Sequence, residues 1–140
     1  MKITKNIEDY LEAIYFLSKD NGVARVKDIA QRLDVKNPSV TQQIQKLTTM
    51  NLVIHRNYGS VFLTDEGEKI GKKIAKRHSI FKHLLCDILD LPADLAEENA
   101  CKMEHAVDPT TMKKFEKLLE FIAKHELNKD LHAFLAESED

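Results

Sequence analysis

The chain has few of the residues that mark several large classes of protein. Its 140 residues include no tryptophan, four glycines, three prolines and two cysteines. Two cysteines, Cys86 and Cys101, cannot form the disulfide framework of a small secreted domain, so we expect free thiols or metal ligands. No apolar run approaches the roughly 20 residues of a membrane-spanning helix, and the polar N-terminus has no signal-peptide core. These absences predict a cytoplasmic protein without a membrane partner.

The distribution of charge separates the chain into two halves. Residues 1–77 carry 14 Lys and Arg against 9 Asp and Glu, a net charge of +5, whereas residues 78–140 carry 7 against 14, a net charge of −7. The small overall charge of −2 conceals this asymmetry. A basic half joined to an acidic half favours a polyanionic partner that binds on one side only.

Two short amphipathic segments in the basic half predict a helix-turn-helix. Apolar side chains recur at helical spacing over residues 26–34 and again up to about Met50. Between the two segments, Asn37 is a suitable N-cap and Pro38 suits the first helical position. Two β-rich runs, 52–55 and 61–63, flank the turn "RNYGS" and predict a hairpin. A helix-turn-helix followed by a hairpin is the winged form of this motif.

The remaining segments are predicted to be helical. The expected helices cover about 7–20, a long stretch from a Thr64 cap to the break at Pro92, 94–107, a stretch that starts at Pro109, and 129–137. We therefore expect a mainly α protein with a small β-hairpin wing. A winged helix-turn-helix DNA-binding domain would cover residues 1–72 and a helical dimerisation domain residues 73–140. The C-terminal helices carry more apolar surface than they can bury alone, which predicts a homodimer.

The polar side chains of the winged helix offer a surface for DNA. A recognition helix points polar side chains at base edges and phosphates, and the wing and the start of the preceding helix reach the backbone. The same side chains also fit the solvated face of a protein-binding winged helix. The residues predicted to contact DNA are Arg25, Lys27, Pro38, Ser39, Thr41, Gln42, Gln43, Lys46, Arg56 and Tyr58.

The stretch "ACKMEHAV" places three metal-binding residue types close together. On a helix, Glu104 lies roughly 60° to one side of Cys101 and His105 roughly 40° to the other. Thiolate, carboxylate and imidazole would then share one face, and such mixed ligation suits borderline divalent ions. One helix rarely completes a metal shell. Asp9 and Glu12, three residues apart on the first helix, and His78 in the long helix are the available additional ligands.

Each of these residues also has an ordinary structural interpretation. Cys101 suits a buried thiol, His105 a hydrogen-bonded core histidine, and the two N-terminal carboxylates a solvated helix face. The residues alone therefore leave open a metal-dependent regulator, a constitutive winged-helix module with a structural Cys/Glu/His cluster, and a small metal enzyme. Because the chain has little loop in which to build a pocket, we expect neither an enzyme nor a small-molecule substrate.

Four stretches resemble the diphtheria toxin repressor family of metal-dependent transcriptional regulators, in its short manganese-transport-regulator form. They are "IEDYLEAIY", "VKDIAQRLDVKNPSVTQQIQKL", "LTDEGEKIGKKIAKRH" and "ACKMEHAVD", and the resemblance covers nearly the whole chain. It implies a dimeric repressor of metal-homeostasis genes that binds a double-stranded operator. The implied corepressor is Mn²⁺ or Fe²⁺, with one or two ions per subunit. The implied metal ligands are Asp9, Glu12, His78, Cys101, Glu104 and His105.

The chain departs from both branches of that family. Manganese-type members resemble it at Asp9 and Glu12, but many carry a carboxylate in place of Cys101. Iron-type members resemble it at Cys101 but carry Met in place of Asp9. Their second metal site also uses a carboxylate four residues after His78, where this chain has Lys82. We therefore expect that site to be weakened, or rebuilt around Glu97 or Glu98, and the choice between manganese and iron stays open.

Overall fold

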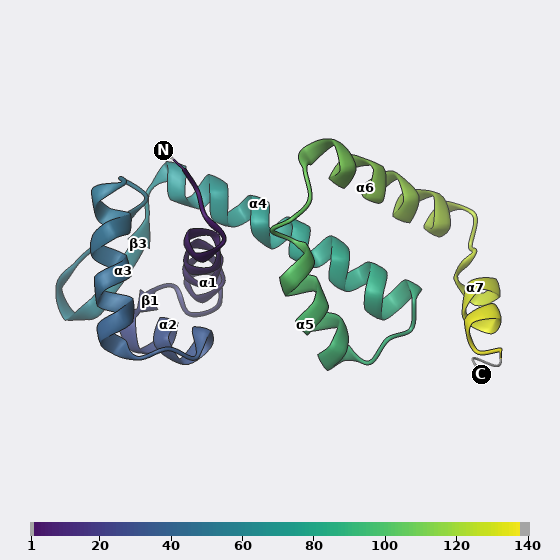
Figure 1. Cartoon of the computed structure of the whole chain (residues 1–140), viewed down its shortest axis with the longest axis horizontal. Coiled ribbons are helices and arrows are strands. Elements are labelled where there is room, and N and C mark those ends of the chain that lie inside the picture. Colours follow the sequence, from purple (N-terminus) through teal and green to yellow (C-terminus); the bar gives the residue numbers. More distant parts are fainter. Residues whose placement is uncertain (1, 138–140) are drawn as a thin grey trace. The chain divides into compact units, whose positions relative to one another are not determined.

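The computed structural model describes residues 2–137 and forms two compact units, residues 1–75 and 76–140 (Figure 1). The outermost residues of the two predicted domains, residue 1 and residues 138–140, lie outside the described part of the chain. A mainly helical fold with a small antiparallel sheet confirms the predicted class. Among residues 2–137, no helix combines the length and apolar character that a membrane span requires.

The N-terminal unit is a winged helix. Helix α1 begins where Thr4 Oγ1 accepts a hydrogen bond from the backbone N–H of Ile7, and it ends at Gly22, whose φ of 78° suits glycine. Ile14, Ile29 and Ile44 are fully buried in the shared core of the unit. Its elements are α1 (Lys5–Asn21), β1 (Ala24–Arg25), α2 (Val26–Leu33), α3 (Asn37–Thr49), β2 (Val53–His55), the 3₁₀ turn η1 (Asn57–Gly59) and β3 (Ser60–Leu63).

Helices α2 and α3 form the predicted helix-turn-helix. The prediction that Asn37 is the N-cap is wrong, because α3 already begins at Asn37 and Lys36 takes the extended cap conformation without a side-chain hydrogen bond. Pro38 follows within the first turn, where its missing N–H costs no hydrogen bond. The apolar stripe of α3 is confirmed, since Val40, Ile44 and Leu47 are fully buried.

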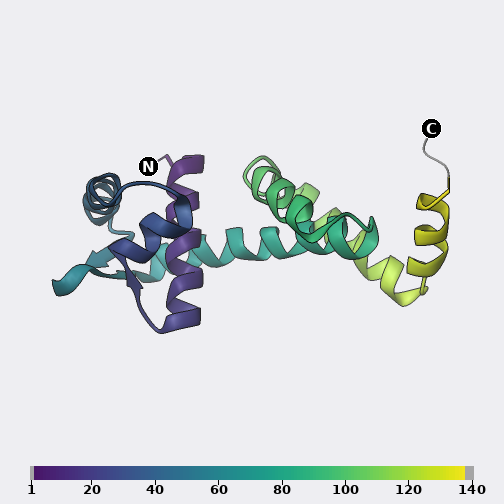
Figure 2. The ribbon, with the colours of Figure 1, turned by 90° about the horizontal axis from the view of Figure 1, so that it is seen from below.

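The predicted hairpin is confirmed but is part of a larger sheet. Strands β2 and β3 pair antiparallel, with Ile54 opposite Phe62. A third strand, β1, pairs with the other edge of β3, giving the order β1-β3-β2. Strand β1 has only two residues, which is too short for the alternation of apolar and polar residues that marks a strand in a sequence. The turn of the hairpin projects away from α1 in both views (Figures 1 and 2) and has Tyr58 at a positive φ of 65°.

Helix α4 (Asp65–Lys82) follows the wing. Thr64 caps it as predicted, because its hydroxyl accepts a hydrogen bond from the N–H of Gly67 and donates one to the carbonyl of Asn51. A Cβ atom at Gly67 would overlap the carbonyl oxygen of Leu52. The glycine is therefore required by close packing between the helix and the start of the wing.

Helices alone, without strands, make up the regular secondary structure of the described residues of the C-terminal unit. The predicted long helix changes into a π-helix after Lys82, and the predicted helix 94–107 is shorter, ending at Met103. The core of this unit is built around Phe81, which lies edge-on to Phe115 with 5.3 Å between ring centroids. Its elements are the last part of α4, η2 (His83–Ile88), α5 (Ala93–Met103), α6 (Pro109–Lys124) and α7 (Asn128–Leu135).

Candidate metal centre

The centre of the candidate site is Glu104, the C-cap residue that directly follows α5. Its side chain is fully buried, although a carboxylate is strongly solvated in water. Its backbone N–H donates to the carbonyl of Ala100, and Nη1 of the buried Arg77 donates to its own carbonyl oxygen at 3.2 Å. The positive guanidinium thereby caps the negative C-terminal end of α5. These contacts fix the backbone from which the carboxylate extends.

His78 on α4 contacts this carboxylate directly. Its Nδ1 lies 2.7 Å from Oε2 of Glu104, and its Nε2 lies 2.9 Å from Oε1 of Glu97. The hydrogen bond to Glu104 raises the pKa of His78 from 6.5 to about 9, against the opposing effect of burial, and Glu97 adds to the rise. In the absence of a metal, His78 is therefore a cation held between two carboxylates.

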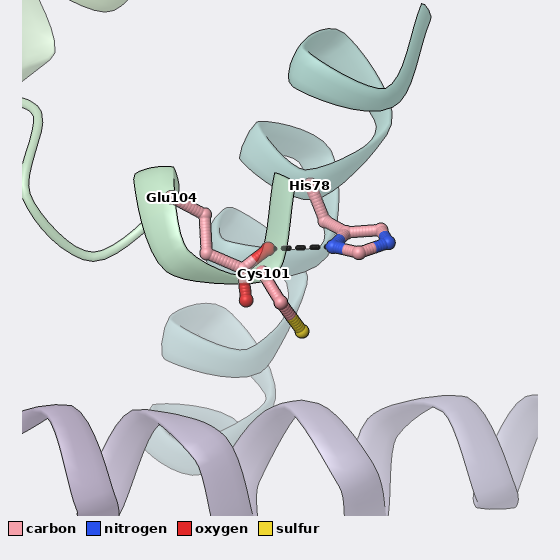
Figure 3. A group of neighbouring side chains, drawn as sticks. All are labelled: His78, Cys101 and Glu104. Carbon is pink, nitrogen blue, oxygen red and sulfur yellow. Dashed lines mark hydrogen bonds and ion pairs between the residues drawn. The ribbon is translucent and has the colours of Figure 1, made fainter. Parts of the chain in front are cut away.

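Cys101 completes a group of three different donors. Figure 3 shows His78, Cys101 and Glu104 gathered between α4 and α5, and their potential ligand atoms all lie within 4.8 Å of one another. Cys101 is exposed, whereas His78 and Glu104 are buried. A nitrogen, a sulfur and an oxygen donor at this spacing fit a borderline divalent cation, which would replace the proton shared by His78 and Glu104.

His105 lies near the other carboxylate oxygen of Glu104. Its Nε2 lies 3.2 Å from Oε1 of Glu104, and Oε1 is buried in a geometry that makes no hydrogen bond with the described residues. The predicted helix that carries Cys101, Glu104 and His105 ends earlier than expected. Because α5 ends at Met103, His105 lies in the following turn. The carboxylate thus lies between two imidazoles and offers one oxygen to each.

Asp9 and Glu12 belong to α1 in the N-terminal unit. Oδ2 of Asp9 lies 3.0 Å from Nζ of Lys5, and Glu12 is buried, at 8% exposure. Glutamate side chains are rarely this buried in folded proteins unless they have a partner. The predicted union of these two residues with the C-terminal ligands remains a prediction.

Arg77 and Lys82 were not predicted as part of the site, and Glu97 was considered only for a rebuilt second site. Arg77 precedes His78, Lys82 lies one turn after it, and Glu97 lies one turn before Cys101. The four-residue spacings were visible in the sequence, but spacing does not show which face of α5 meets α4. The structure also separates Glu97 from Glu98: Glu97 contacts His78, whereas Glu98 pairs with Lys102 on its own helix.

The predicted DNA-contacting residues lie on the winged helix with different exposures. Ser39, Gln42 and Lys46 on α3 are exposed, and Tyr58 at the wing is 92% exposed. A groove of about 460 Å³ is lined by residues that include Arg25, Lys27 and Tyr58. Gln43 differs, because its amide nitrogen is buried and has no hydrogen-bond partner among the described residues. The remaining predicted residues are the exposed Pro38 and Arg56 and the half-buried Thr41.

Comparison with protein families assigns this architecture. The model for the N-terminal DNA-binding domain of iron dependent repressors matches residues 2–61, and the model for their metal-binding and dimerisation domain matches residues 64–130. The chain belongs to the iron-dependent repressor family. It is therefore a transcriptional regulator and not an enzyme, which confirms the family and the function that the sequence predicted.

Individual relatives support the same assignment. The transcriptional regulator MntR of Bacillus pumilus is 34% identical over 118 residues, which cover 84% of this chain and 81% of that protein. MntR of Shouchella clausii is 42% identical over 82 residues, 59% of this chain and 57% of that protein. A solved manganese-dependent transcriptional repressor in complex with manganese is 28% identical, with a TM-score of 0.72 over 82% of this chain. The chain spans 53% of that structure's length.

Proposed function

We propose that the protein is a homodimeric repressor that binds a double-stranded operator when a divalent transition metal, Mn²⁺ or Fe²⁺, is present. It would control metal-homeostasis genes in the cytoplasm. The observation that carries the proposal is the convergence of His78, Cys101 and Glu104 in a unit that matches a metal-binding and dimerisation domain. Residues 1–72 would read DNA, and residues 73–140 would bind metal and dimerise.

The proposed ligands form two groups around one carboxylate. His78 and Cys101 would share an ion with Oε2 of Glu104, while His105 faces Oε1. Asp9 and Glu12 would supply the carboxylates from α1. A bound divalent cation supplies positive charge that several donors share, which removes the repulsion among these acidic groups. The number of ions per subunit, one or two, depends on whether both sides of Glu104 are used.

Binding of metal would act by shifting a population. If the ligands implied by the family resemblance are used, an ion would favour the arrangements in which the donors of α1, α4 and the end of α5 converge. DNA binding then tightens only if those arrangements also hold the two α3 helices of the dimer at the spacing of operator half-sites. Because His78 and Cys101 must lose protons to bind metal, affinity for metal would fall at low pH.

The thiol of Cys101 is the ligand that bears on metal choice. A soft thiolate favours iron or zinc over manganese, whereas the carboxylates favour manganese. Manganese is named for the solved repressor and iron for the family models. Comparison of the wild type with Cys101→Asp would assign the preference: a shift toward Mn²⁺ in the variant identifies the thiolate as the discriminating ligand.

The test is a DNA-binding titration with a duplex selected from a random pool in the presence of Mn²⁺. Fluorescence anisotropy would be measured with Mn²⁺, with Fe²⁺ under anaerobic conditions, and with a chelator. We expect tight binding with metal and a loss of at least tenfold with chelator. Equal affinity in all conditions would instead identify a constitutive winged-helix protein.

A further inference from the structure

A line of charged side chains leads from the surface of the C-terminal unit to the buried carboxylate. Nζ of Lys82 lies 3.1 Å from Oε2 of Glu97, and Oε1 of Glu97 lies 2.9 Å from Nε2 of His78. The other ring nitrogen of His78 faces Glu104. Both nitrogens of His78 and both oxygens of Glu97 are therefore engaged.

Helix geometry brings these groups together. His78 and Lys82 are four residues apart on α4, and Glu97 and Cys101 are four residues apart on α5. Residues at this spacing lie one above the other on the same helical face. The face of α5 that presents Cys101 and Glu104 to the candidate site therefore also presents Glu97 to the far side of His78.

We propose that Glu97 is a positioning residue of the metal centre, acting through His78. A neutral imidazole carries one N–H, and the hydrogen bond made by that N–H decides which nitrogen is left to bind a metal. Glu97 accepts from Nε2–H, so the lone pair of Nδ1 points toward the ion shared with Glu104 and Cys101. This role rests on the proposed function of the site.

Lys82 explains why Glu97 supports the centre and does not bind the ion itself. The Lys82 ammonium forms an ion pair with the second carboxylate oxygen of Glu97 and balances the negative charge of that carboxylate. The family resemblance predicted a second metal site that is weakened, or rebuilt around Glu97 or Glu98. In the structure, Glu97 is committed to His78 and Lys82, and Glu98 to Lys102, so both carboxylates already have cationic partners.

The neighbouring pair provides a matched control. Glu98 lies 3.3 Å from Lys102 on the exposed side of α5, with side-chain exposures of 63% and 68%. Glu97 and Lys82 are also about half exposed, at 49% and 48%. Exposed ion pairs add little to folding stability. Variants at either glutamate should therefore fold, and a difference between them reports on His78.

The experiment compares Mn²⁺ affinity, by calorimetry, in the wild type, Glu97→Ala, Glu97→Gln and Glu98→Ala. Loss of a carboxylate that orients a ligating histidine costs about 10- to 100-fold in affinity, so Glu97→Ala should weaken binding in this range. Glu98→Ala should match the wild type. Glu97→Gln should recover most of the affinity, because an amide oxygen still accepts a hydrogen bond from Nε2–H.

A second readout follows the imidazole itself. With diamagnetic Zn²⁺ bound, the ¹⁵N shifts of His78 should show a metal-bound Nδ1 and a protonated Nε2 in the wild type, and a mixture in Glu97→Ala. Equal Mn²⁺ affinity of the Glu97→Ala and Glu98→Ala proteins, or a metal-bound Nε2, would overturn the positioning role of Glu97 but not the proposed function of the site. Absence of Mn²⁺ and Fe²⁺ binding by the wild type would overturn the proposed function, and this role with it.

Discussion

Nδ1 of His78 lies 2.7 Å from Oε2 of Glu104, and this contact joins α4 to the end of α5 inside the C-terminal unit. A buried carboxylate needs a positive partner, and here that partner is either the proton on the imidazole or a metal ion in its place. The same two residues thus stabilise the metal-free unit and form the core of the proposed metal centre.

The stability of the metal-free protein should fall as pH rises. The folded-state pKa of His78, about 9, lies above the unfolded value of 6.5, so the protonated imidazole stabilises the fold. That contribution is complete below about pH 6.5 and disappears as pH rises through about 9. Urea unfolding with a chelator at pH 6, 7.5 and 9 measures this dependence. The His78→Gln protein should lack the corresponding part of the pH dependence; an identical dependence in both proteins would contradict the assignment.

Glu104→Gln should abolish metal-dependent DNA binding without loss of the fold. The amide keeps the size of the side chain but removes the charge that faces His78 and His105. We expect Mn²⁺ affinity to fall by at least 100-fold, because the ligands around His78 and those around His105 both lose the negative charge of the Glu104 carboxylate. Electron paramagnetic resonance of free Mn²⁺ provides the measurement, and Glu98→Gln is the control. Wild-type affinity in the Glu104→Gln protein would exclude the carboxylate as a ligand.

Gly67→Ala should destabilise the N-terminal unit. A Cβ atom at this position would overlap the carbonyl of Leu52, a backbone atom that cannot move without shifting the start of the wing. Overpacking of this kind costs about 1–3 kcal/mol or more. Thermal unfolding gives the comparison, with Gly22→Ala as a contrast: Gly22 has open space, so only its positive φ opposes the substitution. Equal unfolding midpoints for Gly67→Ala and wild type would refute the close contact.

Gln42 and Lys46 should affect DNA binding in different ways. Both are exposed on α3, one with an amide suited to adenine and one with a charge suited to phosphate. Gln42→Ala should cost about 1–3 kcal/mol on the selected duplex and relax its base preference. Lys46→Ala should weaken binding to all duplexes. It should also lower the slope of the binding constant against salt concentration by about the amount that one phosphate contact contributes. Anisotropy titrations at several salt concentrations separate the two effects. Sequence-selective loss at Lys46 would reverse the assignment.

The exposed apolar side chains of α6 should hold the dimer together. Leu118 and Phe121 are 46% and 52% exposed, although leucine and phenylalanine are usually buried. Leu118→Glu should convert a dimer into a monomer of 16.1 kDa, because a buried unpaired charge opposes association. Light scattering after size exclusion provides the measurement. Lys117→Gln, on the solvated side of the same helix, should stay dimeric. A Leu118→Glu protein that stays dimeric would place the interface elsewhere.

Most of the fold could be predicted from the sequence, because the apolar residues of its core recur at helical spacing. Val40, Ile44 and Leu47 recur at the spacing that buries one helical face, and all three are buried. The errors lie where tertiary contacts override local pattern. The two residues of β1 form a strand only because β3 lies beside them. The helix after Lys82 widens into a π-helix, which no periodicity in the sequence indicated.

The sequence by itself determined the family, the winged helix and the residue types of the metal centre, because those depend on local spacing and on motifs. Tertiary structure decided how the residues are used. Packing of α4 against α5 places Glu104 between His78 and His105 and gives Glu97, but not Glu98, to His78. Contacts between helices far apart in the chain depend on which faces meet, and the spacing within one helix does not specify that.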